Sequence, residues 1–408
     1  MTAPQQIVIV GGGLAGAKTA EALRTQGFAG RLTLLAAENH LPYERPPLSK
    51  GYLAGQASFD EATVHPSQWY RDNDIDLRLG IRATAIDAAA HQVRLADGSS
   101  IGYEKLVLAT GALPRRLPLP GADADGVHYL RTREDADAIR AHFGASKRLA
   151  IIGGGWIGLE VAAAARTADT QVTIFEAAPL PLLGVLGPEL AQVFADLHTA
   201  HGVELRLGAR IDAITSTDGA ATGVRLADGS TIDADAVVIG VGVAPDVRLA
   251  ELAGLQVDNG VLVDASLRSS DPDIYAVGDI ANHDHPVLGR RVRVEHWATA
   301  LNQPATAAAA LLGQQATYTE LPYFFSDQYE LGMEYLGHAP NGSYDQLVVR
   351  GDLAKREFVA FWLTDSRIIA AMNVNVWDVL DQIKPLIVGG TLIDTDLLAD
   401  PDVSYATL

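Results

Sequence analysis

The chain has 408 residues, of which 48% are hydrophobic and 20% charged, and its formal net charge is −19. This length suits two or three domains with large cores, while the acidic balance disfavours nucleic acids and anionic membranes as partners. The chain contains no cysteine, which excludes a disulfide, a catalytic thiol and any metal or iron–sulfur site built on cysteine.

Membrane and secretion signals are the next features that the sequence lacks. No apolar run reaches the roughly 18 residues of a membrane span, and no basic segment precedes the first apolar stretch. We therefore expect a cytoplasmic protein that binds neither membrane nor nucleic acid. No metal site is predicted, so redox chemistry would rest on a bound organic cofactor.

The first predicted unit is a strand, a glycine loop, a helix and a second strand. The run IVIV predicts a buried strand, residues 15–26 predict a helix that ends before Gly27, and RLTLLAAE predicts another strand. The intervening pattern G-x-G-x-x-G consists of Gly11, Gly13 and Gly16. Glu38, at the end of the second strand, is an acid suited to binding a ribose. The segment predicts a dinucleotide site; the alternative is a glycine-rich turn of an unrelated α/β protein.

Two similar segments predict hairpins that lead into buried strands. HQVRLADGSSIGYEKLVLATG begins at His91, and TGVRLADGSTIDADAVVIGVG begins at Thr222. Each contains an Asp-Gly turn of the kind that joins antiparallel strands. The proline-containing runs GALPRRLPLPGA and GVAPD follow them, and we interpret these runs as crossovers between domains.

A second glycine loop follows the first crossover. The segment KRLAIIGGGWIGLEVAAAARTADTQVTIFEAA repeats the strand–loop–helix–strand plan, and its three glycines are Gly153, Gly155 and Gly158. Glu176 closes this unit and favours NADH over NADPH, because a carboxylate repels a 2′-phosphate. Two dinucleotides are therefore implied, and electron transfer requires one of them to be FAD and the other a nicotinamide.

The composition changes from about Leu321. Aromatic residues gather in YFFSDQYELGMEYLG, and segments of alternating character such as EFVAFWL predict an antiparallel sheet. The expected fold is α/β, with two Rossmann-like domains arranged as in glutathione reductase and a C-terminal α+β domain.

The order of these motifs resembles the FAD-dependent pyridine-nucleotide oxidoreductases. PYERPPLSKGYL, which spans Pro42–Leu53, resembles the signature of oxygenase-coupled NADH:ferredoxin reductases. The similarity covers the whole chain, since LATGA, IYAVGDIA, VEHWATALNQ and PYFFSDQY follow in the family's order. The resemblance implies FAD on the first loop and NADH on the second. The domains would then be 1–112 with 245–320 for FAD, 113–244 for NADH, and 321–408 at the C-terminus.

The resemblance also implies roles for individual residues. Lys50 would lie near the flavin N5 and pair with Glu160, which follows the second glycine loop. The residues that would bind FAD are Gly11, Gly13, Gly16, Glu38, Arg45, Lys50, Thr110, Asp279, Glu295, His296, Trp297 and Phe325. Those that would bind NADH are Gly153, Gly155, Gly158, Glu160, Glu176 and Gly242. For Lys50 and Glu160 the alternative is a purely structural ion pair, for Asp279 a turn aspartate, and for Trp297 core packing.

One segment departs from the family pattern. Relatives have PWFWSDQ where this chain has Tyr323 and Phe325, and the second aromatic lies against the flavin ring in those relatives. Phe325 can still stack on a ring, but it has no indole N–H. The departure puts the electron path near this residue in doubt.

The implied function is an NADH:ferredoxin oxidoreductase. A flavin reduced by NADH would pass single electrons to a [2Fe-2S] ferredoxin that serves a haem monooxygenase or, alternatively, an aromatic-ring dioxygenase. An NADH oxidase or quinone reductase and a redox-sensing flavoprotein are less favoured alternatives. Because small ferredoxins are acidic, docking requires local cations. The candidates are Arg290, Arg291 and Arg293, with Arg115 and Arg116 as a second basic pair.

Overall fold

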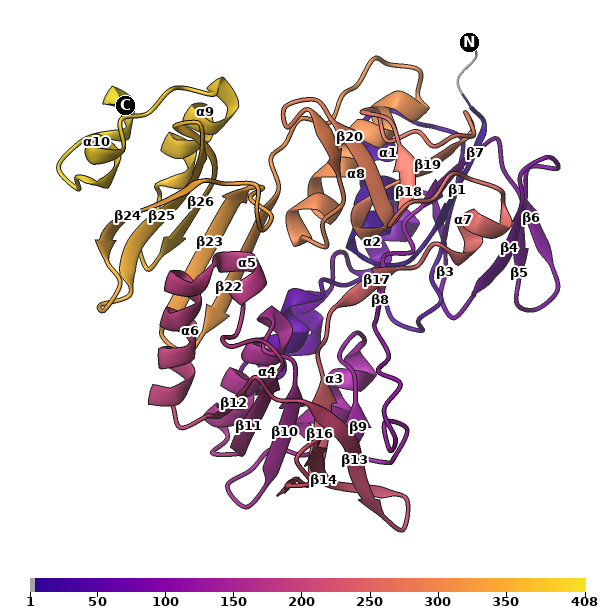
Figure 1. Ribbon diagram of the computed structural model, residues 1–408. Coiled ribbons are helices and arrows are strands. Elements are labelled where there is room, and N and C mark those ends of the chain that lie inside the picture. Colours follow the sequence, from indigo (N-terminus) through magenta and orange to yellow (C-terminus); the bar gives the residue numbers. More distant parts are fainter. Residues whose placement is uncertain (1–3) are drawn as a thin grey trace. The chain divides into compact units, whose positions relative to one another are not determined.

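The structure is a computed structural model that describes residues 4–408. It divides into two compact units, and Figure 1 labels most of their elements. Unit 1 contains the chain up to Arg45 together with Phe59–Leu113 and Val243–Pro322. Unit 2 contains Pro46–Ser58, Pro114–Gly242 and Tyr323–Leu408. The chain therefore passes between the units several times.

Unit 1 is built on a five-stranded parallel sheet in the order β19-β7-β1-β2-β3. The strands are β1 (Gln6–Val10), β2 (Arg31–Leu35), β3 (Ile75–Arg78), β7 (Lys105–Leu108) and β19 (Ile274–Ala276). Side chains on both faces of β1 are buried, as its unbroken apolar run predicts for a strand covered on both sides. This sheet carries the first glycine loop at the end of β1.

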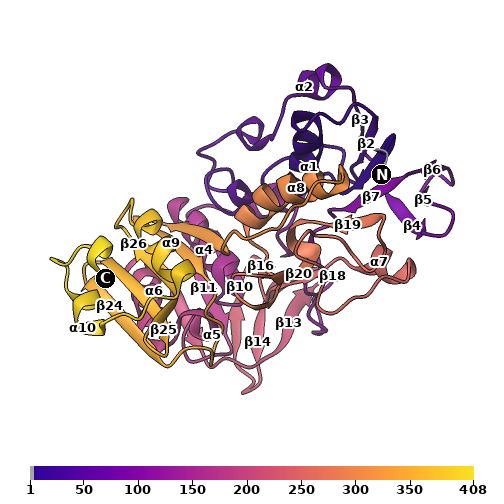
Figure 2. The same cartoon turned by 90° about the horizontal axis from the view of Figure 1, so that it is seen from above.

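Two helices distant in sequence pack together in unit 1. Helix α1 (Leu14–Thr25) follows the glycine loop, and α8 (Trp297–Leu311) lies beside it, as Figures 1 and 2 both show. Both helices are rich in alanine, whose small side chain lets helices approach closely. The helix expected over 15–26 is thus confirmed within one residue at each end.

Small sheets complete unit 1: two have three strands, and in a third β8 (Ala112–Pro114) pairs with β17 (Val243–Pro245). The first three-stranded sheet is antiparallel and contains β4 (Ala83–Asp87), β5 (Gln92–Leu95) and β6 (Ser100–Gly102). The second contains β18 (Val261–Val263), β20 (Ala281–His285) and β21 (Arg290–Val292). The first predicted hairpin is the pair β5–β6, which leads into β7. The remaining elements are η2 (Phe59–Ala62), α2 (Ser67–Asp72), α7 (Arg248–Leu252) and η3 (Gly278–Ile280).

Unit 2 contains a second parallel sheet, in the order β12-β11-β10-β16-β9. Its strands are β9 (Val127–His128), β10 (Arg148–Ile152), β11 (Gln171–Glu176), β12 (Glu204–Leu207) and β16 (Ala236–Ile239). The second predicted hairpin lies in the antiparallel sheet of β13 (Ile211–Thr217), β14 (Ala220–Leu226) and β15 (Thr231–Asp233). The helical elements are η1 (Pro46–Ser49), α3 (Arg133–Arg140), α4 (Trp156–Thr167), α5 (Leu183–Leu186) and α6 (Pro188–Ala200).

The C-terminal part of unit 2 is a five-stranded antiparallel sheet in the order β22-β23-β26-β25-β24. Its elements are β22 (Tyr323–Gln328), β23 (Leu331–Gly337), β24 (Gln346–Asp352), β25 (Glu357–Thr364), β26 (Arg367–Val374), α9 (Leu380–Gly389), α10 (Thr395–Ala399) and η4 (Tyr405–Thr407). Figure 1 shows α9 and α10 beside these strands. The predicted fold class, two Rossmann-like domains and a C-terminal α+β domain, is confirmed.

The antiparallel sheet predicted from EFVAFWL is confirmed, but the alternating character of this segment does not appear in its burial. All six residues of Phe358–Leu363 are buried. The reason is that β25 lies between two other strands and both of its faces are covered. The ring of Tyr405 lies 6.1 Å from that of Phe361, and the ring of Tyr335 lies 5.2 Å from that of Trp362. In the part of the chain that the structure describes, no helix is long and apolar enough to span a bilayer.

The glycine loop of unit 2 generates a stability prediction. A Cβ on Gly158 would stand 2.2 Å from the carbonyl oxygen of Gly153, whereas a Cβ on Gly155 would meet no atom within 4 Å. The backbone must move to admit a Cβ on Gly158. We therefore expect Gly158→Ala to lower the free energy of unfolding by about 1–3 kcal/mol. Urea unfolding of the two variants measures this difference. Gly155→Ala is the control, and equal stability of both variants would contradict the packing argument.

Candidate functional site

The first glycine loop leaves an open cradle at the start of α1. Gly11 has φ +124°, and a Cβ there would stand 2.1 Å from the carbonyl oxygen of Ala109. A Cβ on Gly16 would stand 1.9 Å from the carbonyl oxygen of Gly11, but a Cβ on Gly13 would meet nothing within 4 Å. Among the residues that the structure describes, no side chain caps the helix. The N–H groups of the first helical turn and the positive end of the helix dipole therefore border open space, which fits the pyrophosphate of FAD.

Glu38 lies beyond the end of β2, as predicted, and binds two neighbouring side chains. Its Oε1 accepts a hydrogen bond from Arg45 Nη2 at 2.7 Å, and its Oε2 accepts one from the Tyr43 hydroxyl at 2.5 Å. A carboxylate has about four acceptor positions, so Glu38 retains capacity for ribose hydroxyls. Arg45 is thereby held at the same acid that the sequence singles out.

Two further residues predicted to bind FAD lie at strand ends of the same sheet. The Thr110 hydroxyl, just after β7, donates to the carbonyl oxygen of Asp246 at 2.8 Å. Asp279 lies in η3, and a Cβ on its neighbour Gly278 would stand 3.0 Å from the Cβ of Ala15. The η3 turn therefore lies against the first turn of α1, and Asp279 is close to the first glycine loop.

The segment from Arg290 to Trp297 is more tightly bonded than the sequence suggests. The Arg293 side chain is only 7% exposed; its Nη1 lies 2.6 Å from Glu295 and donates to the carbonyl oxygen of Asp279 at 3.2 Å. Arg293 is therefore not part of an exposed basic cluster with Arg290 and Arg291, both of which are exposed. Arg291 also donates from Nη1 to the carbonyl oxygens of Val263 and Asn282.

His296 and Trp297 begin helix α8. His296 occupies the N-cap position, and Trp297 is the first helical residue. The indole Nε1 of Trp297 donates to Glu44 Oε2 at 2.9 Å. This bond connects α8 to the PYERPPLSKGYL segment, so Trp297 does more than fill the core.

The second glycine loop repeats the geometry of the first. Gly153 has φ +111°, and a Cβ there would stand 2.4 Å from the carbonyl oxygen of Gly240. Gly155 again faces open space at the start of α4, and no side chain within residues 4–408 caps that helix. The residues present therefore fit a second pyrophosphate, that of NADH.

Glu176 and Gly242 border this loop. Glu176, the last residue of β11, accepts hydrogen bonds from the backbone N–H of Gly154 at 2.6 Å and of Ala178 at 2.8 Å. Gly242 has φ +93°, and its carbonyl oxygen accepts from the N–H of Arg115 at 2.9 Å. The Glu176 carboxylate is thus held at the loop, where the ribose of a dinucleotide is expected.

Lys50 and Glu160 form a buried ion pair within unit 2. Lys50 Nζ lies 2.6 Å from Glu160 Oε1, and their side chains are 16% and 3% exposed. Two hydroxyls also donate to the carboxylate: Ser49 Oγ at 2.5 Å to Oε2 and Ser326 Oγ at 2.7 Å to Oε1. Three donors satisfy a buried anion that would otherwise be costly. The structure thus brings together two residues that lie 110 positions apart.

Sequence reasoning missed the residues that continue this network. Gln328 Nε2 donates to Ser326 Oγ at 3.1 Å, and Gln328 Oε1 lies 2.9 Å from His198 Nε2. Ser326 and Gln328 alternate along β22, so both point to one face of the strand. That spacing in PYFFSDQY was the available signal, but nothing in the sequence shows which helix covers that face.

The other face of β22 carries Phe325 and Asp327. Lys50 Nζ lies 5.3 Å from the centre of the Phe325 ring. Burial raises the pKa of Asp327, and the nearby Glu160 and Glu334 raise it further against the opposing charge of Lys50. Phe325 therefore lies beside the ion pair of Lys50 and Glu160.

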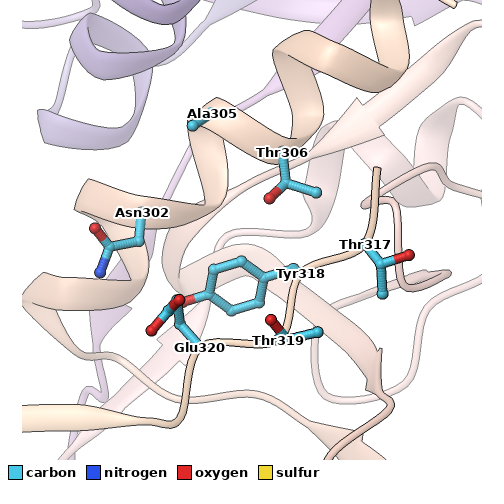
Figure 3. Close-up of a pocket in the computed structure, with 7 residues that line it drawn as sticks. All are labelled: Asn302, Ala305, Thr306, Thr317, Tyr318, Thr319 and Glu320. Carbon is cyan, nitrogen blue, oxygen red and sulfur yellow. The ribbon is translucent and has the colours of Figure 1, made fainter. Parts of the chain in front are cut away.

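Figure 3 shows a pocket in unit 1 that contains none of the residues predicted for either cofactor. It lies between the middle of α8 and the segment that follows this helix. Its lining residues are Asn302, Ala305, Thr306, Thr317, Tyr318, Thr319 and Glu320.

The buried side chain of His198 makes the stability of the fold depend on pH. Burial lowers the pKa of His198 from 6.5 to about 4. Below pH 6.5 the unfolded chain therefore binds a proton that the folded chain does not, and stability falls as the pH decreases towards 4. Between pH 7 and pH 5 we expect a loss of about 2 kcal/mol from this residue. Urea unfolding at both pH values should show a smaller loss for His198→Gln than for the unchanged chain; parallel losses would contradict this origin.

Comparison with known proteins agrees with this geometry. Residues 5–304 match the family model described as pyridine nucleotide-disulphide oxidoreductase, and residues 323–408 match the one described as reductase C-terminal. The ferredoxin reductase subunit of the 5,5′-dehydrodivanillate O-demethylase of Sphingobium is 44% identical over 98% of this chain and 97% of its own. The reductase component of the anthranilate 1,2-dioxygenase system of Burkholderia cepacia is also 44% identical, over 98% of each chain.

A solved structure also matches nearly the whole chain. The reductase in the covalent complex of putidaredoxin reductase with putidaredoxin superimposes with a TM-score of 0.95, at 38% identity, over 99% of this chain and 98% of its own. These matches extend over both glycine loops and the C-terminal sheet. The chain therefore belongs to the pyridine nucleotide-disulphide oxidoreductase family, among its FAD- and NADH-dependent ferredoxin reductases.

Proposed function

We propose that this reductase takes electrons from NADH and delivers them to a [2Fe-2S] ferredoxin that serves a haem monooxygenase in the cytoplasm. The observation that carries the proposal is the pair of open glycine cradles together with the buried pair of Lys50 and Glu160. The alternative terminal enzyme, an aromatic-ring dioxygenase, is supported by the relative from the anthranilate dioxygenase system.

FAD would bind on the first loop, with residues 1–112 and 245–320 as its domain. Gly13 leaves room for the pyrophosphate, Glu38 accepts hydrogen bonds from the adenosine ribose, and Arg45 holds Glu38 in place. Thr110, Asp279, Glu295, His296, Trp297 and Phe325 complete the proposed FAD-binding set.

NADH would bind on the second loop, with residues 113–244 as its domain and 321–408 as a separate C-terminal domain. Gly155 leaves room for its pyrophosphate, and Glu176 accepts from its ribose. The same carboxylate disfavours NADPH, because it would face a 2′-phosphate at close range. Glu176 is bonded to two backbone N–H groups and therefore stays at the loop.

The chain's own residues would orient the cofactors and stabilise charge. When bound, FAD accepts a hydride from NADH and releases electrons singly, so no protein acid or nucleophile is needed. Lys50 supplies a positive charge that favours the reduced, negatively charged flavin. Glu160 keeps that ammonium in one place and compensates for its burial.

The acceptor is not reduced through a thiol of this chain. The family description includes disulphide oxidoreductases, but this sequence has no cysteine. A disulfide or peroxide acceptor that reacts with an enzyme thiol is therefore excluded. A small one-electron carrier fits the remaining chemistry.

Anaerobic stopped-flow of the FAD-loaded protein tests the proposal. We expect NADH to bleach the flavin quickly and NADPH to do so at least tenfold more slowly. A [2Fe-2S] ferredoxin added next should restore the yellow colour. Slow bleaching that leaves a persistent long-wavelength band, which ferredoxin does not discharge, would instead indicate a redox-sensing flavoprotein.

The ferredoxin would dock near Arg290 and Arg291, the two exposed arginines of β21. Arg290 is the residue chosen for the test, because it is exposed on β21. We expect Arg290→Glu to raise the KM for ferredoxin about three- to tenfold, more strongly at low salt. Reduction of a small dye by NADH should not change.

The matched control for this charge reversal is Arg94→Glu. Arg94 is 63% exposed on β5, and the change alters net charge equally. Steady-state assays at two salt concentrations compare the variants. Equal effects of both substitutions would refute docking at β21, as would equal losses with ferredoxin and dye.

A further inference from the structure

We propose that Ser326 and Gln328 are positioning residues for the flavin chemistry: they orient Glu160 and thereby set how strongly the charge of Lys50 is neutralised. The proposal rests on the function proposed above. It deepens that function by extending the Lys50–Glu160 pair into a directed chain of hydrogen bonds within unit 2.

The first step is the sharing of one carboxylate oxygen. Lys50 Nζ and Ser326 Oγ both bind Glu160 Oε1, at 2.6 and 2.7 Å. Ser49 and Lys50 come from one segment, whereas Ser326 comes from β22. The hydroxyl of Ser326 is therefore the contact that fixes the carboxylate from a second direction. It also withdraws electron density from the oxygen that faces the ammonium.

The second step is the direction of the Ser326 hydroxyl. A hydroxyl has one donor hydrogen and can equally well accept. Because the amide nitrogen of Gln328 donates to Ser326 Oγ at 3.1 Å, the serine hydrogen is directed to Glu160. If the amide were reversed, its oxygen would compete for that hydrogen.

The third step is the orientation of the Gln328 amide. Gln328 and His198 are both fully buried, and Oε1 of the amide lies 2.9 Å from His198 Nε2. On the other side of the ring the Tyr329 hydroxyl lies 3.4 Å from Nδ1. A neutral histidine that accepts at Nδ1 carries its hydrogen on Nε2 and donates to the amide oxygen. The chain thus has one direction, from Tyr329 to Glu160.

The consequence concerns the electrostatic field of Lys50. Without the serine hydrogen, Oε1 of Glu160 carries more negative charge and neutralises more of the ammonium. The reduced flavin would then be less stabilised. Removing this donor should lower the flavin reduction potential without weakening FAD or NADH binding, because neither Ser326 nor Gln328 belongs to a glycine loop.

Ser326→Ala in the FAD-loaded protein tests the proposal. The midpoint potential, measured by reductive titration against a reference dye without NADH or ferredoxin, should fall. We expect a threefold to tenfold change in the reduction equilibrium, which is about 15 to 30 mV for a two-electron couple. Reduction by NADH should slow by a similar factor in kcat, with KM unchanged.

Three further variants separate positioning from general damage. Ser326→Thr keeps the hydroxyl and should restore most of the potential. Gln328→Met removes the directing amide at similar volume and should shift the potential in the same direction by a smaller amount. Tyr323→Phe is the matched control, since it deletes another hydroxyl of β22, one that donates to Glu334 at 2.8 Å.

The outcomes are decisive in both directions. An unchanged potential in Ser326→Ala, or an equal shift in Tyr323→Phe, would overturn the proposal. So would failure of threonine to restore the potential while FAD still binds. If the unchanged protein were not reduced by NADH, the proposed function would fail, yet the titration would still report whether Ser326 tunes the flavin.

Discussion

The contact on which both cofactor sites depend is a backbone-to-backbone approach that only glycine permits. In each unit the first glycine of the loop lies against the carbonyl group that follows a neighbouring parallel strand, Ala109 in one and Gly240 in the other. A Cβ would stand 2.1 or 2.4 Å from that oxygen. This approach brings the helix N-terminus to the carboxyl edge of the sheet, where open sheets bind ligands. The middle glycine then leaves open space for a phosphate.

The buried ion pair of Lys50 and Glu160 imposes a second constraint. Its main contribution is not to the stability of the fold. Removing two charges from water costs several kcal/mol for each ion, and a buried pair seldom repays this cost fully. Hydrogen bonds to a charged group contribute about 1.5–3 kcal/mol each. The hydroxyls of Ser49 and Ser326 therefore serve to make burial of Glu160 tolerable. What the arrangement achieves is a positive charge held at one point, which a solvated lysine could not provide.

Local patterns made much of the fold predictable, whereas long-range contacts were predictable only by resemblance. The glycine loops, the first helix and the Asp-Gly hairpins follow from residues that are neighbours in sequence. The pairing of Lys50 with Glu160 joins segments 110 positions apart, and only the family signature indicated it. The burial of Arg293 could not be predicted. Its side chain pairs with Glu295 and donates to the carbonyl oxygen of Asp279 in η3, and local sequence does not show that η3 lies beside it. The network beyond Ser326 depends on α6, which no motif connects to β22.

The two loops also show how one motif produces two different sites. Glu38 is bonded to the side chains of Tyr43 and Arg45. Glu176 is bonded instead to backbone N–H groups, that of Gly154 in the glycine loop and that of Ala178 just after β11. Side-chain partners can adjust their positions when a ligand binds, and Arg45 brings a positive charge to the first site. Backbone partners cannot move without the loop itself, so the negative charge of Glu176 stays where a 2′-phosphate would have to lie. If Glu176 binds the NADH ribose as proposed, its backbone hydrogen bonds contribute to the selection against NADPH together with its charge.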